Sequence, residues 1–198
     1  MEFKALVIIM LSAALVNNYV LRKFLAVCPF LGVSKELKSS VGMGCAVVFV
    51  MVLAGAATWP IYHYILDPNG LGFMQTVVFI IVIATLVQLV EIVLKKHIPA
   101  LYKTLGIYLP LMTTNCAVLA LTIVNINDEY TYIEAVVNAI GAGLGFLLAM
   151  VLFTNVRQAA EKADPPGPFK GAPIMLISAA ILSLAFFAFE GVIENLFG

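Results

Sequence analysis

The stretch that decides the fold is VGMGCAVVFVMVLAGAATWPI, residues 41–61. It contains no charged side chain. An α-helix rises about 1.5 Å per residue and the hydrocarbon core of a bilayer is about 30 Å thick, so roughly 20 apolar residues are enough to cross a membrane. The stretch therefore predicts a transmembrane helix, and similar runs occur on both sides of it.

The whole chain is built from such runs. Of its 198 residues, 63% are hydrophobic and 11% are charged, and the mean hydropathy is +1.06. This composition excludes a water-surrounded globular domain, and the balance of 11 basic and 11 acidic residues excludes a nucleic-acid groove. We predict an all-α membrane protein with six transmembrane helices, at residues 5–25, 41–61, 73–94, 101–124, 133–156 and 174–193.

The basic residues indicate how these spans are oriented, because Lys and Arg near span ends stay on the cytoplasmic side. Ten of the eleven flank the first, third and fifth connections: Arg22, Lys23, Lys35, Lys38, Lys95, Lys96, Lys103, Arg157, Lys162 and Lys170. The second and fourth connections hold acidic residues and no cation. We therefore predict that the odd-numbered loops are cytoplasmic and that both termini lie outside.

The two halves of the chain resemble each other. Residues 41–53 align with residues 140–152 at a shift of 99, which also pairs Glu91 with Glu190, and a shift of 97 pairs Asn18 with Asn115. Because each half holds three spans, the second half must be inverted relative to the first. We predict one polytopic domain of two inverted three-helix repeats, 1–97 and 98–198. The alternative is that small residues simply recur in packed bundles.

Spans one and four carry polar residues at membrane depth. Asn17-Asn18 interrupts the first span, and Thr113-Thr114-Asn115 interrupts the fourth. Pro29 and Gly32 are also expected to break a helix. Non-helical backbone at this depth is tolerated only where protein or a water-filled cavity surrounds it. We therefore predict that helices 1 and 4 are broken and half-spanning at the membrane midplane; ordinary kinks and interhelical hydrogen bonds are the alternative.

A cysteine accompanies each broken segment, Cys28 the first and Cys116 the second. Cys45, in a Gly-rich apolar stretch, is expected to pack as a small hydrophobic residue. Thiolates are the ligands of iron–sulfur clusters, but a cluster usually has four, so two cysteines would make half a site and a partner chain would supply the rest. A disulfide between the two cysteines is the alternative.

The most deeply placed acid is Glu91, in the third span. A charge at this depth costs about 2.5–3.5 kcal/mol on insertion scales, and such residues usually face the bundle interior and mark ion or proton paths. We therefore expect a cation path at Glu91 and at Glu190, its mate in the repeat. A structural acid that is protonated or hydrogen-bonded to a neighbouring helix is the alternative.

Four long motifs carry a resemblance to a known family: VNNYVL (16–21), FLAVCPFLGVS (24–34), LGIYLPLMTTNCAV (105–118) and PFKG (168–171). Through them nearly the whole chain resembles the family that includes the Rnf A protein and the D and E subunits of the sodium-pumping NADH:quinone reductase. Asn17-Asn18 and Cys28-Pro29-Phe30 resemble the Rnf A form. Ala26 departs from a position where the family commonly has Gly.

The resemblance implies a multi-pass component of an ion-translocating ferredoxin:NAD oxidoreductase in the bacterial cytoplasmic (inner) membrane, active only within its complex. It implies that Cys28 and Cys116 are two of four ligands of a [2Fe–2S] cluster, shared with the homologous Rnf E subunit. The Rnf D, G, B and C subunits would be further partners, and flavins and other iron–sulfur clusters are expected only in other subunits. Electron relay would be coupled to Na⁺ or H⁺ movement.

The residues expected around the cluster are Asn18, Pro29, Thr113, Thr114 and Asn115, and the Asn and Thr side chains among them would hydrogen-bond its sulfurs. The rival interpretation is a self-contained inverted-repeat secondary transporter, in which inverted repeats, broken spans and a buried acid are equally expected. Iron distinguishes the two, because the relay needs a partner chain with two matching cysteines, whereas a transporter would move solute alone.

Overall fold

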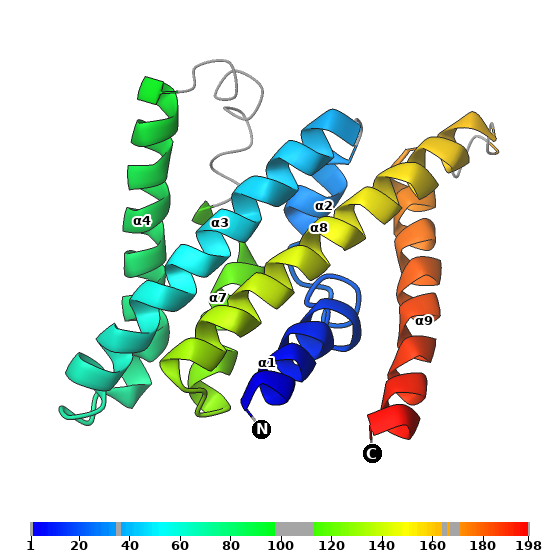
Figure 1. Cartoon of the computed structure of the whole chain (residues 1–198). Helices are drawn as coiled ribbons and strands as arrows, with labels where there is room; N and C mark the ends of the chain where they lie inside the picture. Colours follow the sequence, from blue (N-terminus) through cyan, green and yellow to red (C-terminus); the bar gives the residue numbers. More distant parts are fainter. Residues whose placement is uncertain (1, 35–36, 98–112, 164–165, 167–170, 198) are drawn as a thin grey trace.

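The computed structural model is all-helical in the residues that it describes, which are 2–34, 37–97, 113–163, 166 and 171–197. Its elements in chain order are α1 (Glu2–Leu11), η1 (Ser12–Val16), α2 (Val27–Val33), α3 (Leu37–Ile61), η2 (Tyr62–Leu66), η3 (Gly72–Met74), α4 (Gln75–His97), α7 (Cys116–Asn127), α8 (Tyr132–Lys162) and α9 (Ala172–Phe197). Figure 1 shows α3 and α8 side by side at the centre, running in opposite directions, with α4 and α9 at opposite sides.

Among the described residues, three stretches are long and apolar enough to cross a membrane: Leu37–Leu66, Gly72–Val93 and Tyr132–Lys162. Shorter apolar helices cover Leu6–Leu15, Cys116–Asn127 and Ala172–Phe187. The predicted spans at 41–61, 73–94, 133–156 and 174–193 each correspond to one helix, namely α3, α4, α8 and α9. The first half of the predicted fourth span, 101–112, lies outside the described residues, and α7 forms most of its second half.

The largest interface among the described elements is the packing of α3 against α8. A glycine on each helix lets the two backbones approach closely. A Cβ on Gly143 would lie 3.0 Å from the Cα of Val48, and a Cβ on Gly44 would collide with the side chain of Leu147. The two contacts are reciprocal, because a shift of 99 turns Gly44 into Gly143 and Val48 into Leu147. Each contact therefore maps onto the other under the shift that aligns the two halves.

The first predicted span is interrupted, as its polar residues indicate. Helical structure stops at Val16 and resumes at Val27, so Asn17-Asn18 begins a non-helical segment, residues 17–26, which we call the break. The prediction that Pro29 and Gly32 break the helix is wrong, because both lie inside α2. Pro29 is the third residue of α2, where a backbone N–H would have no acceptor within the helix, so its missing donor costs nothing.

The described charges separate toward two ends of the molecule. α1 begins and α9 ends at the end that also holds the α3–α4 and α7–α8 connections, while α3 begins and α4 and α8 end at the other (Figure 1). The first end holds Asp67, Asp128, Glu129 and Glu134 with one described cation, Lys4, and the second holds Lys38, Lys95, Lys96 and Lys162 with the acid Glu161. Arg22 and Lys23 differ from the expected pattern, since they lie in the break and not beside the first connection.

Candidate functional site

The break and the start of α7 meet at a sulfur atom. Cys116 is the first residue of α7, and its Sγ accepts a hydrogen bond from the backbone N–H of Ala26, with 2.8 Å between N and S. Ala26 is the residue that caps the start of α2, and Cys28 is the second residue of that helix. The starts of α2 and α7 therefore lie together although they are far apart in sequence. We call the helices α2 and α7 the half-helices.

The cysteines of the half-helices are open to the surroundings of the chain. Cys28 and Cys116 are exposed free thiols, as is Cys45 on α3, where a packed residue was expected. Within the described ranges, no three or more His, Cys, Asp or Glu side chains gather into a group that would hold a metal ion. The two half-helix cysteines thus offer two sulfur ligands at a surface that a second chain can reach.

Asn115 caps the start of α7. Its Oδ1 accepts a hydrogen bond from the backbone N–H of Ala117 at 3.0 Å, which is the usual arrangement of a helix N-cap. The residue is 4% exposed, and its Nδ2 has no hydrogen-bond partner among the residues that the structure describes. A buried unsatisfied donor costs about 1–3 kcal/mol. An acceptor beside Cys116 would remove that cost, and the partial positive charge of the helix start would favour an anionic one.

The predicted polar cluster of the fourth span lines a cavity of about 270 Å³. Its walls are Thr113, Thr114, Asn115, Cys116 and Leu119, together with Ile80 and Ile83 of α4. The sequence prediction that the polar residues before Cys116 lie beside it is therefore reflected in the geometry. Cys28 and Pro29 do not line this cavity; Pro29 is buried in α2, next in sequence to Cys28.

The backbone that leads into α2 adopts an unusual conformation. Ala26 has φ 62° and Phe24 has φ 51°, in the left-handed region that costs a non-glycine residue about 1–2 kcal/mol. Ala26 is completely buried. Its N–H is the one that donates to Cys116 Sγ, so the strained residue is also the contact between the half-helices.

Asn18 holds the start of the break. Its Nδ2 donates to the carbonyl oxygens of Gly145 at 2.8 Å and Ala14 at 3.2 Å, and its Oδ1 accepts from the N–H groups of Val20 at 3.0 Å and Leu21 at 3.4 Å. The expected role of Asn18 was a hydrogen bond to a cluster sulfur. The structure instead engages both of its donors and its acceptor with backbone groups.

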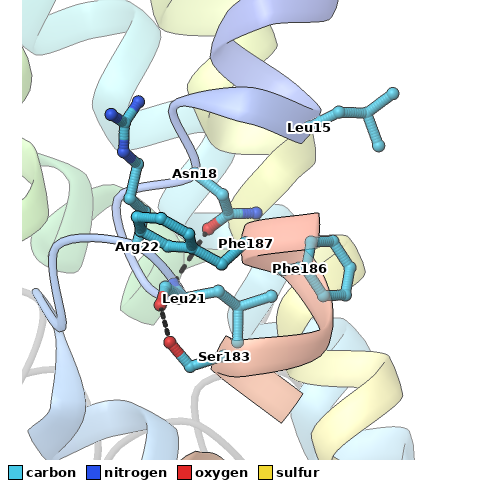
Figure 2. Close-up of a pocket in the computed structure, with 7 residues that line it drawn as sticks. All are labelled: Leu15, Asn18, Leu21, Arg22, Ser183, Phe186 and Phe187. Carbon is cyan, nitrogen blue, oxygen red and sulfur yellow. Dashed lines mark hydrogen bonds between the residues drawn. The ribbon is translucent and has the colours of Figure 1, made fainter. Parts of the chain in front are cut away.

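A second helix completes the support of the break. Figure 2 shows Ser183 of α9 beside Leu21, and the Ser183 hydroxyl donates to the Leu21 carbonyl oxygen. The space between these residues, Asn18 and the α9 phenylalanines is only about 10 Å³, room for no more than one water molecule. The N–H groups of Val20 and Leu21 and the carbonyl oxygen of Leu21 are thus hydrogen-bonded to side chains of the protein, which suits non-helical backbone in a lipid environment.

Arg157 binds the C-terminal end of α2. In the sequence it serves only to predict the orientation of the spans in the membrane. It is 4% exposed. Its Nη1 donates to the Leu31 carbonyl oxygen and to the Ser34 hydroxyl, each at 2.9 Å, and its Nε donates to Glu161 at 3.0 Å. No signal in the sequence points to this contact, because Arg157 directly follows the predicted span 133–156 and is there one of the cations that flank the fifth connection.

The predicted acids lie apart from the cysteines. Glu91 is half-buried on α4, five residues before Lys96 and near the end of that helix. Glu190 falls within α9, but its side chain lies outside the described residues. Glu91 lines neither of the cavities described above.

These features define a class: an all-helical membrane protein in which an interrupted span meets, at a cysteine, the start of another helix. A family model described as "Rnf-Nqr subunit, membrane protein" matches residues 6–193. The chain belongs to this family.

Several characterised relatives match over nearly their full length. The chain is 53% identical to the A component of the Na⁺-translocating ferredoxin:NAD⁺ oxidoreductase complex of Acetobacterium woodii, over 94% of this chain and 97% of the relative. It is 49% identical to the A component of the ion-translocating oxidoreductase complex of Syntrophotalea carbinolica, over 97% and 100%. The protein of the same name from Vibrio parahaemolyticus is 47% identical, over 95% and 98%.

Proposed function

We propose that this chain is the A-type membrane component of an ion-translocating ferredoxin:NAD oxidoreductase, and that it relays electrons through a [2Fe–2S] cluster shared with a homologous subunit. Cys28 and Cys116 would supply two of the four ligands, and two cysteines of the partner would supply the others. The cluster would accept and donate one electron at a time inside the membrane. The relatives named above carry the name of this component, and the chain matches nearly their whole length.

The observation that carries the proposal is the contact between Ala26 N–H and Cys116 Sγ. It joins the start of the helix that bears Cys28 to the first residue of the helix that bears Cys116. Both thiols are exposed on a membrane protein, which suits ligands that must meet those of a second chain. A disulfide would instead leave the neighbouring polar groups unexplained.

The polar groups near Cys116 suit such a cofactor. The buried Nδ2 of Asn115 lacks an acceptor among the described residues, and cluster sulfurs are acceptors that raise the reduction potential when they are hydrogen-bonded. The Ala26 N–H already points to a sulfur ligand. Thr113 and Thr114 line the same cavity as Cys116 and are the further candidates for this role.

The proposal includes the architecture of two inverted repeats, residues 1–97 and 98–198, with six spans of which the first and fourth are broken. The reciprocal contacts of Gly44 with Leu147 and of Gly143 with Val48 support it, because a pair of units related by a two-fold axis makes each contact twice. The charge separation between the two ends supports odd-numbered loops in the cytoplasm and both termini outside.

Ligand substitution tests the relay. In the purified complex, Cys28→Ser or Cys116→Ser should abolish the electron paramagnetic resonance signal of the intramembrane cluster while the complex still assembles. Cys45→Ser is the matched control, because Cys45 is an equally exposed cysteine on α3, and it should leave the signal intact. A signal that persists in the Cys28→Ser and Cys116→Ser complexes would refute the ligand assignment.

The shared site is tested by separating the partners. We expect the chain purified alone to hold no stoichiometric iron, and the complex with its homologous partner to hold it, because two thiolates are half of the usual set. If the chain alone transports a solute after reconstitution and needs no iron, the secondary transporter is the correct function instead.

Glu91 and Glu190 remain the proposed cation path, for either Na⁺ or H⁺. The half-burial of Glu91 on a helix of a membrane protein supports a functional carboxylate. We expect Glu91→Gln to lower ion transport by reconstituted vesicles while ferredoxin-dependent NAD reduction continues. Transport that stays coupled to electron transfer in this variant would remove Glu91 from the path.

A further inference from the structure

We propose that Arg157 is a positioning residue for Cys28, which it keeps in place by binding the end of the half-helix α2. The proposal rests on the proposed function, in which Cys28 is a cluster ligand. It goes beyond that function by naming the contact that fixes the ligand. Arg157 lies on α8, in the other half of the chain, so the second half would control the geometry of a ligand in the first.

The half-helix α2 needs such a contact because it is short. It has seven residues, whereas isolated helices shorter than about 12–15 residues are marginal even in water. Arg157 binds the Leu31 carbonyl oxygen and the Ser34 hydroxyl. Leu31 lies one helical turn after Cys28, so a shift of this end of the helix is passed on directly to the cysteine.

The C-terminal end of α2 favours a positively charged side chain as its partner. The last carbonyl groups of a helix have no partner within it and carry partial negative charge, and a positive side chain stabilises them. The break ends at the opposite end of α2, where the Ala26 N–H meets Cys116. The half-helix is therefore held at both ends, by a sulfur at its start and by Arg157 at its end.

The burial of Arg157 indicates that the contact matters. A buried charge is costly unless it is hydrogen-bonded and paired. Its ion-pair partner Glu161 is 53% exposed, whereas Arg157 is 4% exposed. Surface pairing with Glu161 alone would leave the guanidinium free to turn outward. Its Nη1 instead lies between two acceptors of the α2 end.

A matching contact exists on the other half-helix. Trp59 of α3 donates from Nε1 to the carbonyl oxygen of Tyr130, at 2.7 Å, just beyond the end of α7. Leu31 and Tyr130 are 99 residues apart and the donors Trp59 and Arg157 are 98 apart, whereas the half-helix cysteines, Cys28 and Cys116, are 88 apart. Thus α3 donates a hydrogen bond to backbone near the end of α7, and α8 donates one to backbone near the end of α2. An arginine with no structural role would not be expected to make such a contact.

The test uses the whole complex with Arg157→Met, which keeps an unbranched apolar side chain and removes the charge and the donors. We expect amide hydrogen exchange of residues 27–34 to become about tenfold faster, as loss of hydrogen bonds to a charged group predicts. Exchange of residues 128–131, beside the Trp59 contact, should not change. The resonance signal of the cluster should broaden or weaken, and its reduction potential should fall. Arg157→Lys should restore part of each property.

Lys162→Met is the matched control, because it removes an exposed cation from the same helix, and it should alter neither measurement. If Arg157→Met leaves both the exchange of residues 27–34 and the cluster signal unchanged, the proposal is overturned. It is also overturned if exchange accelerates while the signal and potential stay constant, because Arg157 would then stabilise α2 without positioning the ligand.

Two further variants keep the test decisive. If the Arg157→Met complex does not assemble, Ser34→Ala removes one acceptor only and should give a smaller change of the same kind; no change would overturn the proposal. Trp59→Phe should accelerate exchange at residues 128–131 and not at 27–34. Failure of the proposed function is seen separately, as a cluster signal that survives Cys28→Ser, while the exchange data still report whether Arg157 holds α2.

Discussion

Ala26 is a non-glycine residue at φ 62°, completely buried, and its N–H binds Cys116. We predict that Ala26→Gly raises the stability of the complex by about 1 kcal/mol, because glycine enters this conformation without strain. The family that the sequence resembles commonly has Gly here. The measurement is the thermal unfolding midpoint of the purified complex.

The control for this prediction is Ala54→Gly, in the buried middle of α3. It should lower stability by about 1 kcal/mol, the ordinary cost of glycine in a helix interior. If Ala26→Gly lowers the midpoint as Ala54→Gly does, the left-handed conformation of Ala26 is not a source of strain.

The orphan donor of Asn115 gives a second prediction at this scale. Asn115→Asp keeps an oxygen that caps α7 but removes the Nδ2 donor. We expect the reduction potential of the cluster to fall by tens of millivolts, since a hydrogen bond of about 1.4 kcal/mol corresponds to about 60 mV for one electron. Redox titration followed by resonance spectroscopy measures it. Asn69→Asp, in the exposed α3–α4 connection, should leave the potential unchanged; a fall there too would point to charge and not to the lost donor.

Individual residues were predictable where local composition was unusual. Cys28, Cys116 and Asn115 stand out because they interrupt or border apolar runs. Arg157 did not, since its role depends on how α8 packs on α2, which no local pattern contains. The rule that Pro29 and Gly32 break helices failed because α2 begins late enough to place Pro29 in its first turn.

At the scale of elements, the glycines of α8 govern how closely the first span approaches. A Cβ on Gly145 would lie 2.7 Å from the Ala14 carbonyl oxygen and 3.1 Å from Asn18 Nδ2. We predict that Gly145→Ala destabilises the complex by about 1–3 kcal/mol, the usual cost of overpacking, because backbone on η1 has to move. It should also weaken the cluster signal, since Asn18 holds the break.

The matched control is Gly42→Ala on α3, where a Cβ would meet nothing within 4 Å. It should be neutral or raise stability by up to about 1 kcal/mol, because alanine is the better helix former. Equal thermal midpoints for the Gly145→Ala and Gly42→Ala complexes would contradict the close approach of η1 to α8.

The long elements followed from the sequence much better than the short ones. Runs of about 20 apolar residues must be helical in lipid, since the backbone has no other way to satisfy its hydrogen bonds. Composition therefore predicted α3, α4, α8 and α9. The extents of the break and of α2 depend instead on partners far away in sequence, such as Gly145 and Ser183, so only the start of the interruption, at Asn17-Asn18, was predictable.

At the scale of the whole molecule, the two ends differ in charge, and this predicts the orientation in the membrane. A cysteine introduced by Asn69→Cys should react with a membrane-impermeant maleimide in intact cells. One introduced by Lys162→Cys should react only after permeabilisation, because loops that carry basic side chains stay on the cytoplasmic side. The reverse labelling pattern would invert the proposed topology.

In the proposed repeat architecture, the packing of α3 against α8 has a consequence for how the two halves can diverge. In a symmetric dimer the two copies of a contact come from one gene position, so a substitution always appears on both sides. Here the corresponding positions are separate residues of one chain. Gly44 and Gly143 have stayed the same, whereas the donors near the half-helix ends differ, tryptophan at 59 and arginine at 157. Two halves joined in one chain can thus acquire a charged side chain beside only one of the two cysteine-bearing helices. A dimer of two identical chains cannot.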